Sequence, residues 1–224
     1  KVAVSGILIA IDAGHGSGGP AGKIVNGVFE GSTAGTSGKY EESYIDEYQI
    51  NWDIAEKLIN KLNNAGITAF RTRDNELNVN FDVRIDNIMK KNSKPADLVI
   101  SIHADSGTRK GVAVIYHSGT NKKQFYSDYG KRFAEDFTAL LKKKYTTVEV
   151  NIQHAGGTDS YTDVNSPSIL TGNSEDNYPP AIIIETGFMN NLDEIDRLVN
   201  GQDALVKAIA DSLVEYINSK QNMA

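Results

Sequence analysis

The feature that most constrains the fold is a set of continuous apolar runs of strand length. Residues 7–11, 98–102 and 181–184 consist almost entirely of Ile, Leu, Val and Ala. Apolar runs of this length without alternation are typical of strands that are buried on both faces of a sheet. Each run is far shorter than the roughly 20 apolar residues that cross a bilayer. The runs therefore predict the interior of a globular domain and no membrane span.

Segments with helical periodicity separate these runs. Apolar residues recur at helical spacing within 45–65, and Gly66 suits the position just past a helix end. Alternating strands and helices predict an α/β fold, with a twisted, mostly parallel sheet and helices on both faces. We expect one domain that spans residues 1–224. The other expected elements are strands at 68–72, 111–116 and 148–152 and helices at 81–91, 122–144 and 203–218.

Two long polar segments interrupt the pattern. Residues 12–44 are rich in glycine, and residues 156–180 are rich in Ser, Asn, Thr and Asp. We expect both segments to be surface loops, since neither can contribute to a core. Loops of this length are often functional.

Composition excludes several classes of function. The 29 acidic residues outnumber the 23 Lys and Arg residues, which argues against a nucleic-acid-binding protein. The absence of cysteine excludes disulfides, thiolate ligands and a cysteine nucleophile, so any metal must be bound by His and carboxylate side chains. The chain begins at Lys1 without a signal-peptide pattern, as expected of a mature or trimmed form.

Polar residues that could carry chemistry follow the apolar runs. His15 comes shortly after the first run, His103 directly after the second and Glu185 directly after the third. Glu47 lies in the first turn of the helix predicted over 45–65. Ligands gather at the carboxyl ends of strands in open α/β sheets. A catalytic zinc ion takes three protein ligands, and His15, His103 and one glutamate would suit it. Zn²⁺ is therefore the expected cofactor.

Glu185 has two interpretations. A carboxylate at the rim of a buried strand costs free energy unless it forms an ion pair or has a catalytic role. Glu185 is therefore either a general base or the partner of an arginine such as Arg73 or Arg84. His117 and His154 are the remaining histidines, and an exposed structural role is favoured for both over substrate contact. The glycines around His15 lack the lysine of a P-loop and the pattern of a dinucleotide site, so we reject a nucleotide site.

Taken together, these motifs resemble the zinc-dependent N-acetylmuramoyl-L-alanine amidases of bacterial autolysins and phage endolysins, over almost the whole chain. The matching segments are Asp12-Ala-Gly-His-Gly16, Glu47-Tyr-Gln-Ile-Asn51-Trp-Asp-Ile-Ala55, Thr72-Arg73-Asp74 with Arg84, Ser101-Ile-His103-Ala104, and Pro180-Ala-Ile-Ile-Ile-Glu185-Thr-Gly-Phe188 with Asn190 and Asn191.

The resemblance implies a hydrolase that degrades the bacterial cell wall. By motif it assigns zinc to His15, Glu47 and His103 and the catalytic role to Glu185. The implied reaction is cleavage of the amide bond between N-acetylmuramic acid and L-alanine in peptidoglycan. It further implies action outside the cell or in the wall, with no nucleic-acid or membrane partner. The resemblance leaves room for a separate wall-binding domain outside this chain.

Two departures from the family pattern affect details. The segment between His15 and Glu47 is longer than usual and contains other acidic residues that compete for the glutamate assignment: Glu30, Glu41, Glu42 and Asp46. Asp105 stands where the family commonly has asparagine. The long polar segments are hypothesised to shape the groove for the substrate peptide.

Three alternatives differ in class or in substrate. A zinc exopeptidase would use the same metal chemistry, but the residues after His15 lack the glutamate of a His-x-x-Glu ligand pair. A peptidoglycan-binding module with a structural zinc site would not need a general base such as Glu185. A glycosidase is disfavoured, because nothing in the sequence places two carboxylates across a sugar.

Overall fold

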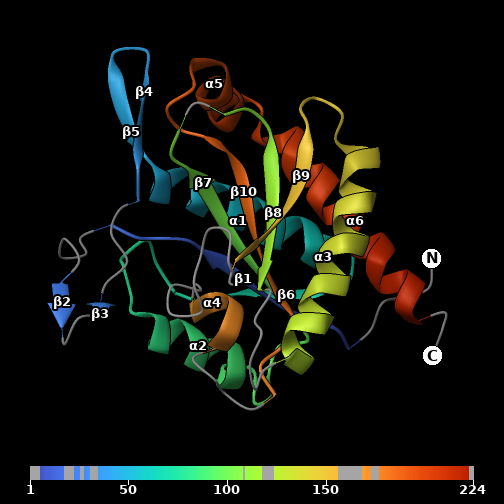
Figure 1. Cartoon of the computed structure of the whole chain (residues 1–224). Coiled ribbons are helices and arrows are strands. Elements are labelled where there is room, and N and C mark those ends of the chain that lie inside the picture. The colour runs from blue at the N-terminus through green and yellow to red at the C-terminus, as the bar shows by residue number, and fades with distance from the viewer. Residues whose placement is uncertain are drawn as a thin grey trace.

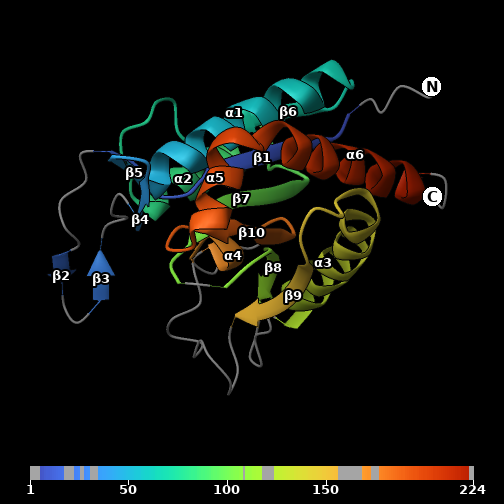
Figure 2. The ribbon, with the colours of Figure 1, turned by 90° about the horizontal axis from the view of Figure 1, so that it is seen from above.

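Figure 1 shows a central sheet with helices packed around it. This computed structural model describes residues 6–17, 23–25, 28–30, 35–107, 109–117, 124–155, 168–172 and 177–221. The sheet has six strands in the order β6-β1-β7-β10-β8-β9, which follow one another across the molecule in Figure 2. Their bounds are β1 Leu8–Ala13, β6 Thr68–Arg71, β7 Leu98–Asp105, β8 Val112–His117, β9 Val150–Ala155 and β10 Ala181–Phe188.

The sheet is mostly parallel, as predicted. Strand β8 runs antiparallel to β10, and the other neighbouring pairs are parallel. Strands β1, β7 and β10 therefore end at the same edge of the sheet. The single-domain α/β prediction is confirmed.

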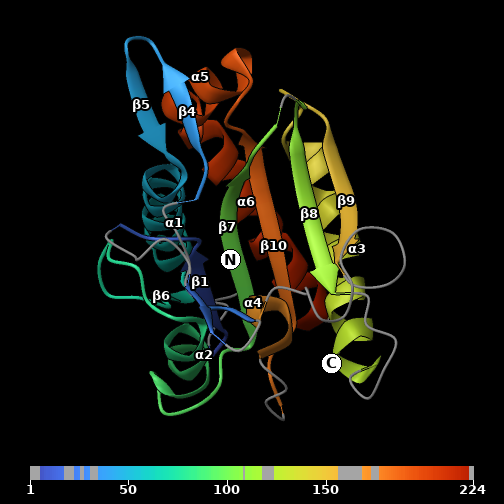
Figure 3. The same ribbon diagram turned by 60° about the vertical axis from the view of Figure 1, so that its left-hand side comes forward.

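Helices cover both faces of the sheet, also as predicted. Helices α1, α3 and α6 pack on one face, while α2 and α4 pack on the other. In Figure 3, α3 and α6 are seen behind the strands and α4 lies in front of them. The helix bounds are α1 Glu47–Asn64, α2 Phe81–Lys90, α3 Gln124–Lys144, α4 Ser168–Thr171, α5 Leu192–Asn200 and α6 Gln202–Gln221.

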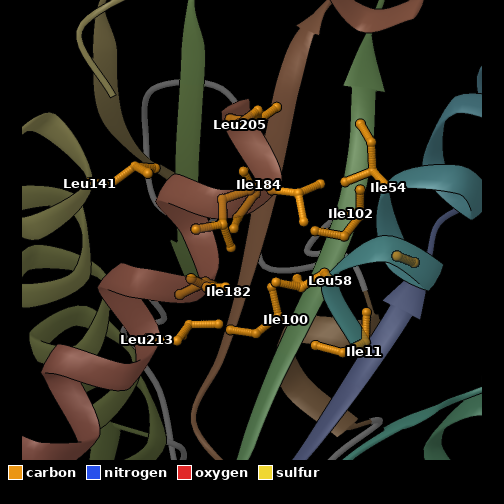
Figure 4. Packing of buried hydrophobic residues seen from close by; sticks show 14 of the residues in the cluster. Ile11, Ile54, Leu58, Ile100, Ile102, Leu141, Ile182, Ile184, Leu205 and Leu213 are labelled. Carbon is orange, nitrogen blue, oxygen red and sulfur yellow. The ribbon is translucent and has the colours of Figure 1, made fainter. Parts of the chain in front are cut away.

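The two-sided covering explains why the central strands are continuously apolar. Successive side chains of a strand point to opposite faces, so both faces need apolar residues. Ile100 and Ile102 face the cluster shared with α1, whereas Val99 faces the smaller cluster shared with α2 and α4. The larger cluster appears in Figure 4, which labels Ile11, Ile54, Leu58, Ile100, Ile102, Leu141, Ile182, Ile184, Leu205 and Leu213.

The prediction that residues 12–44 form one long loop is wrong for the described part of this segment. This segment contains two antiparallel pairs, formed by β2 (Lys23–Val25) with β3 (Val28–Glu30) and by β4 (Ser37–Tyr40) with β5 (Ser43–Asp46). The strands of the second pair are short and mostly polar, so they carry no apolar signal. The 156–180 segment includes α4, and the rest of its length beyond 168–172 and 177–180 lies outside the described residues.

Two strands are longer than their apolar runs indicate. His103 and Glu185 were expected at strand ends, but β7 continues to Asp105 and β10 to Phe188. The register between these strands shifts after Glu185, and pairing resumes between Asp105 and Phe188. The strands continue through polar residues and a register shift, so their apolar pattern stops before the strands end.

Candidate metal centre and active site

The structure brings His15, Glu47 and His103 together. One donor atom of each residue lies within 4.8 Å of the others. The distance is 3.1 Å from Glu47 Oε1 to His103 Nδ1 and 3.4 Å from Glu47 Oε2 to His15 Nε2. Tetrahedral zinc with donors at about 2.0–2.2 Å separates its ligand atoms by roughly 3.3–3.6 Å. The donor types therefore suit a zinc ion. The 3.4 Å spacing lies within this range, and the 3.1 Å spacing is slightly shorter than it.

Each of these residues comes from a different part of the fold. His15 follows β1, Glu47 is the first residue of α1, and His103 lies in β7. Glu185 of β10 is the register partner of His103 across the β7–β10 pair. Register partners in a sheet project to the same face, so the Glu185 side chain stands beside the histidine.

The Glu47 carboxylate is held by several donors. Its Oε1 accepts from Asn51 Nδ2 at 3.2 Å and from the Ala104 backbone N–H at 3.2 Å, and its Oε2 accepts from the Thr36 N–H at 3.0 Å. Burial works to raise the pKa of Glu47, but the hydrogen bond to His103 and the charges of His103 and His15 lower it to about 2. Glu47 is therefore ionised, as a metal ligand must be.

His103 has the opposite shift. Burial works to lower the pKa of His103, but the hydrogen bond to Glu47 and the charge of Glu185 raise it to about 9. Together the two residues form a charged imidazolium–carboxylate pair when no metal is bound. A metal ion binds neutral imidazole, so it would have to displace a proton from His103.

Glu185 carries a buried oxygen without a hydrogen-bond partner among the described residues, Oε2. Burial raises its pKa to about 8, and the charges of Glu47 and Asp105 act in the same direction while His103 opposes them. The ion-pair interpretation of Glu185 is not supported, because Arg84 pairs with Asp12 and Arg73 donates to the Ala13 carbonyl. A strongly shifted carboxyl beside a metal-ligand set is a typical candidate for acid–base chemistry.

Comparison with known proteins gives the family. The family model described as N-acetylmuramoyl-L-alanine amidase matches residues 9–215. The chain belongs to this amidase family. The resemblance read from the sequence motifs is therefore confirmed, and the match supports amidase activity on peptidoglycan for this chain.

Relatives of this amidase cover nearly all of the chain. LytC of Bacillus subtilis (strain 168), an N-acetylmuramoyl-L-alanine amidase, is 26% identical over 221 residues, covering 96% of this chain and 36% of LytC. YqiI of the same organism is 26% identical over 220 residues, covering 96% of this chain and 85% of YqiI. The crystal structure of Ami1, the amidase of Mycobacterium smegmatis, has a TM-score of 0.70 and 22% identity, covering 96% of this chain and 99% of Ami1.

The loop that carries His15 in this amidase has an unusual backbone. His15 has a φ of 57°, in the left-handed region that residues other than glycine rarely adopt. Such a conformation costs about 1–3 kcal/mol and persists where the surroundings hold it in place. Asp12, near the end of β1, accepts hydrogen bonds from Thr72 Oγ1 at 2.5 Å and Ser101 Oγ at 2.7 Å.

Two further residues hold the site, and the sequence analysis gave neither of them a role. Asn51, which is fully buried, donates to the Gly14 carbonyl at 3.2 Å as well as to Glu47. It lies four residues after Glu47, one helical turn away, and it belongs to the sequence motif that resembles the family. Thr36, whose N–H donates to Glu47, directly precedes β4 and has no signal in the sequence that predicts this contact.

His117 and His154 lie away from this site. Strand β8 runs antiparallel to β10, with Ala113 opposite Glu185, so His117 lies four residues further from the site, or roughly 13 Å along the strand. The exposed His154 ring lies 6.1 Å from that of Tyr116. The expected exposure is confirmed for His154 but is wrong for His117, which is buried at the end of β8. The distance of His117 from the site favours a structural role over substrate contact.

Glu47 is the acidic residue that joins the histidines, among the side chains that the structure describes. Its rivals Glu41, Glu42 and Asp46 belong to β5 and the turn before it, and none of them is in the group. The side chain of Glu30 lies outside the described residues. The described part of the chain also contains no helix long and apolar enough to cross a membrane.

Proposed function

We propose that this chain is a zinc-dependent N-acetylmuramoyl-L-alanine amidase that cleaves the amide bond between N-acetylmuramic acid and L-alanine in peptidoglycan. The observation that carries the proposal is the convergence of His15, Glu47 and His103 beside Glu185, whose buried Oε2 has no hydrogen-bond partner among the described residues. Membership of the amidase family supports the choice of substrate.

The three converging residues would hold the metal, and they leave one tetrahedral position for water or substrate. When bound, zinc would supply a Lewis acid that polarises the scissile carbonyl and lowers the pKa of water. Glu47 arrives at the site already ionised and fixed by three hydrogen-bond donors, so little rearrangement is needed to bind a cation. Its buried position also keeps competing water away from the ligand oxygens.

Glu185 would act as the general acid–base. Its carboxylate would accept the proton of the attacking water and then donate it to the leaving amine of L-alanine. In the metal-free chain its raised pKa of about 8 keeps much of it protonated at neutral pH. A nearby cation favours the charged form, so metal binding would lower this pKa and provide the base.

The proposed roles are separated by measuring zinc content and peptidoglycan hydrolysis in the same variants. His15→Ala and His103→Ala should lose both zinc and activity, since each removes a ligand. Glu185→Gln should retain zinc and lose activity by about 10²–10⁴-fold, the usual contribution of a general acid–base. His154→Ala is the matched control, because it removes an exposed histidine away from the site.

Two outcomes would contradict the proposal. Turnover by Glu185→Gln at the wild-type rate would remove the acid–base role. Full zinc content in both histidine variants would remove the proposed ligand set.

The products distinguish the remaining alternatives. A zinc exopeptidase would release free amino acids, and a peptidoglycan-binding module would give no products. The raised pKa and unpaired oxygen of Glu185 favour a catalytic site over a structural one, because a closed structural site needs no base.

The cellular setting is part of the proposal. We infer that the chain acts outside the cell or in the wall, where peptidoglycan is found, as an autolysin or a phage endolysin. We also infer that residues 1–224 form one catalytic domain. The chain spans about a third of the length of LytC, and a separate wall-binding domain stays a prediction.

A further inference from the structure

The guanidinium of Arg84 lies against the loop that carries His15. Arg84 belongs to α2 and is 1% exposed. Its Nη1 donates to the Ala13 carbonyl at 2.7 Å, and its Nη2 donates to the His15 carbonyl at 2.6 Å. One planar group therefore fixes the carbonyls on both sides of Gly14.

The rest of the guanidinium is also engaged. Nη1 donates to Asp12 Oδ1 at 2.8 Å, and Nε donates to the Val79 carbonyl at 3.2 Å. The Arg84 side chain thus joins α2 to the segment before α2, to the end of β1 and to the loop after β1. A guanidinium can do this because its donors form a rigid planar fork, whereas a lysine ammonium is a point charge on a flexible stem.

Arg84 hydrogen-bonds to the strained part of this backbone, at His15. His15 has a φ of 57°, and the direction of its imidazole depends on that angle. A hydrogen bond to the His15 carbonyl fixes the peptide unit that follows this residue, and the bond to Ala13 fixes the one before Gly14. Released from these bonds, the loop would relax toward common backbone angles and turn the imidazole away from Glu47.

We propose that Arg84 is a positioning residue that holds His15 in its metal-binding orientation. The inference rests on the proposed zinc site. The hydrogen bonds described between Arg84 and this loop are made to the backbone carbonyls of Ala13 and His15. Helix α2 has its own apolar contacts through Ile85 and Ile88, so Arg84 is not what attaches this helix to the sheet.

Arg73 provides a matched comparison. It is equally buried, at 1% exposed, and its Nε also donates to the Ala13 carbonyl, at 3.1 Å. Its Nη1 donates to the Asn75 carbonyl, and its guanidinium lies over the Trp52 ring at 4.6 Å. No hydrogen bond joins Arg73 to His15 among the described contacts, so its replacement disturbs the same region without releasing the ligand.

The test measures zinc affinity directly. Wild-type chain, Arg84→Lys and Arg73→Lys are freed of metal and titrated with zinc in competition with a chromophoric chelator, and the thermal unfolding of each metal-free protein is recorded. Lysine keeps the charge beside Asp12 but cannot reach both loop carbonyls. Arg84→Lys should weaken zinc binding by about 10- to 100-fold, as loss of an outer-shell partner does, and Arg73→Lys by less than about threefold.

The outcomes separate this inference from the proposed function. If the wild-type chain binds no zinc, the metal site and the inference both fail. If the wild type binds zinc and Arg84→Lys binds it equally well, the metal site stands and the inference is overturned. Equal losses in both variants would also overturn it, because the effect would then be general destabilisation.

A second measurement needs no substitution and covers the case in which Arg84→Lys does not fold. NMR spectra of the arginine guanidinium groups in the metal-free wild type should show Arg84 Nη protons that are distinct and slow to exchange, since all three nitrogens are bonded. Averaged, rapidly exchanging Arg84 signals would show that the loop is not held before metal binds, and would overturn the inference.

Discussion

Two of the proposed ligands pack against glycines that leave no room for a side chain. A Cβ atom at Gly14 would lie 2.4 Å from His103 Nε2, and one at Gly35 would lie 2.3 Å from Glu47 Oε2. Gly35 also has a φ of 82°, which favours glycine. At both positions glycine allows the backbone to approach a ligand closely.

Gly14→Ala should therefore impair metal binding more than folding. The added methyl group must displace the His103 ring, so we expect zinc affinity to fall by at least about tenfold, in the range seen when ligand orientation is lost. Gly130→Ala is the control, because its Cβ would meet only the Ala181 carbonyl at 3.6 Å and alanine favours the helix by about 0.5–1 kcal/mol. Zinc titration and thermal unfolding of both variants check the prediction, which equal zinc affinities would contradict.

Asp12 makes stability depend on pH. Burial works to raise the pKa of Asp12, but the charge of Arg84 and hydrogen bonds from Thr72, Arg84 and Ser101 lower it from 3.8 to about 2. A carboxyl with a lowered folded-state pKa stabilises the fold above its unfolded pKa and loses that effect as pH falls toward the folded value. The contribution is about 2 kcal/mol, present above pH 4 and lost between about pH 4 and pH 2.

Urea unfolding of metal-free wild type and Asp12→Asn between pH 2 and pH 6 measures this contribution. The asparagine variant should be less stable near pH 6, because Arg84 loses its buried partner. The difference between the two proteins should then shrink as pH falls below 4. A difference that stays constant over this range would contradict the assignment.

At the scale of elements, helix α5 holds the carboxyl end of β10. Arg197 donates to Glu194 Oε2 at 2.6 Å and to the Thr186 carbonyl at 2.7 Å, directly after Glu185 in the chain. Both members of the pair are largely buried. The buried pair therefore links α5 to the strand that carries the proposed catalytic residue.

Removing one member of this pair should be costly. Arg197→Ala leaves the Glu194 carboxylate buried without its partner, and we expect a loss of about 3–5 kcal/mol in the free energy of unfolding. Lys207→Ala removes an exposed pair with Asp211 on α6 and should cost less than about 1 kcal/mol. Urea denaturation of both variants gives the comparison, and similar losses would contradict the role assigned to the buried pair.

The elements predicted from the sequence are those with a strong local signal. The apolar runs were sufficient to predict β1, β7 and β10, and the helical periodicity was sufficient to predict α1. Gly66 follows the end of α1 with a φ of 85°, as its position in the sequence indicated. Helix α5 was missed because it is only nine residues long. The β4–β5 pair was missed because its stability comes from tertiary contacts, such as the close approach of Gly38 to the Met189 carbonyl.

At the scale of the whole molecule, the site depends on the topology of the sheet. The expectation that His15, His103 and Glu185 would meet followed from strand ends sharing one edge, and the structure brings them there. The role of Glu47 was implied by resemblance to the family, since nothing local in the helix shows where its first turn points. The contacts of Arg84 could not be predicted, because they join residues up to 72 positions apart.

Because the topology brings the proposed site together, measuring metal-dependent hydrolysis tests the whole site at once. The proposed site combines residues from four separate parts of the chain: His15, Glu47, His103 and Glu185. A metal-dependent reaction therefore requires this edge of the sheet to be folded. Chelation should therefore abolish hydrolysis, and added zinc should restore it. The bond that is cut identifies the substrate class directly.

The most direct test is mass spectrometry of purified peptidoglycan digested by the wild-type chain, with and without a chelator and after zinc is restored. We predict intact stem peptides with a free L-alanine amine and unbroken glycan strands, formed only when zinc is available. Cleaved glycan strands, free amino acids, or the same peptides formed equally well under chelation would contradict the account.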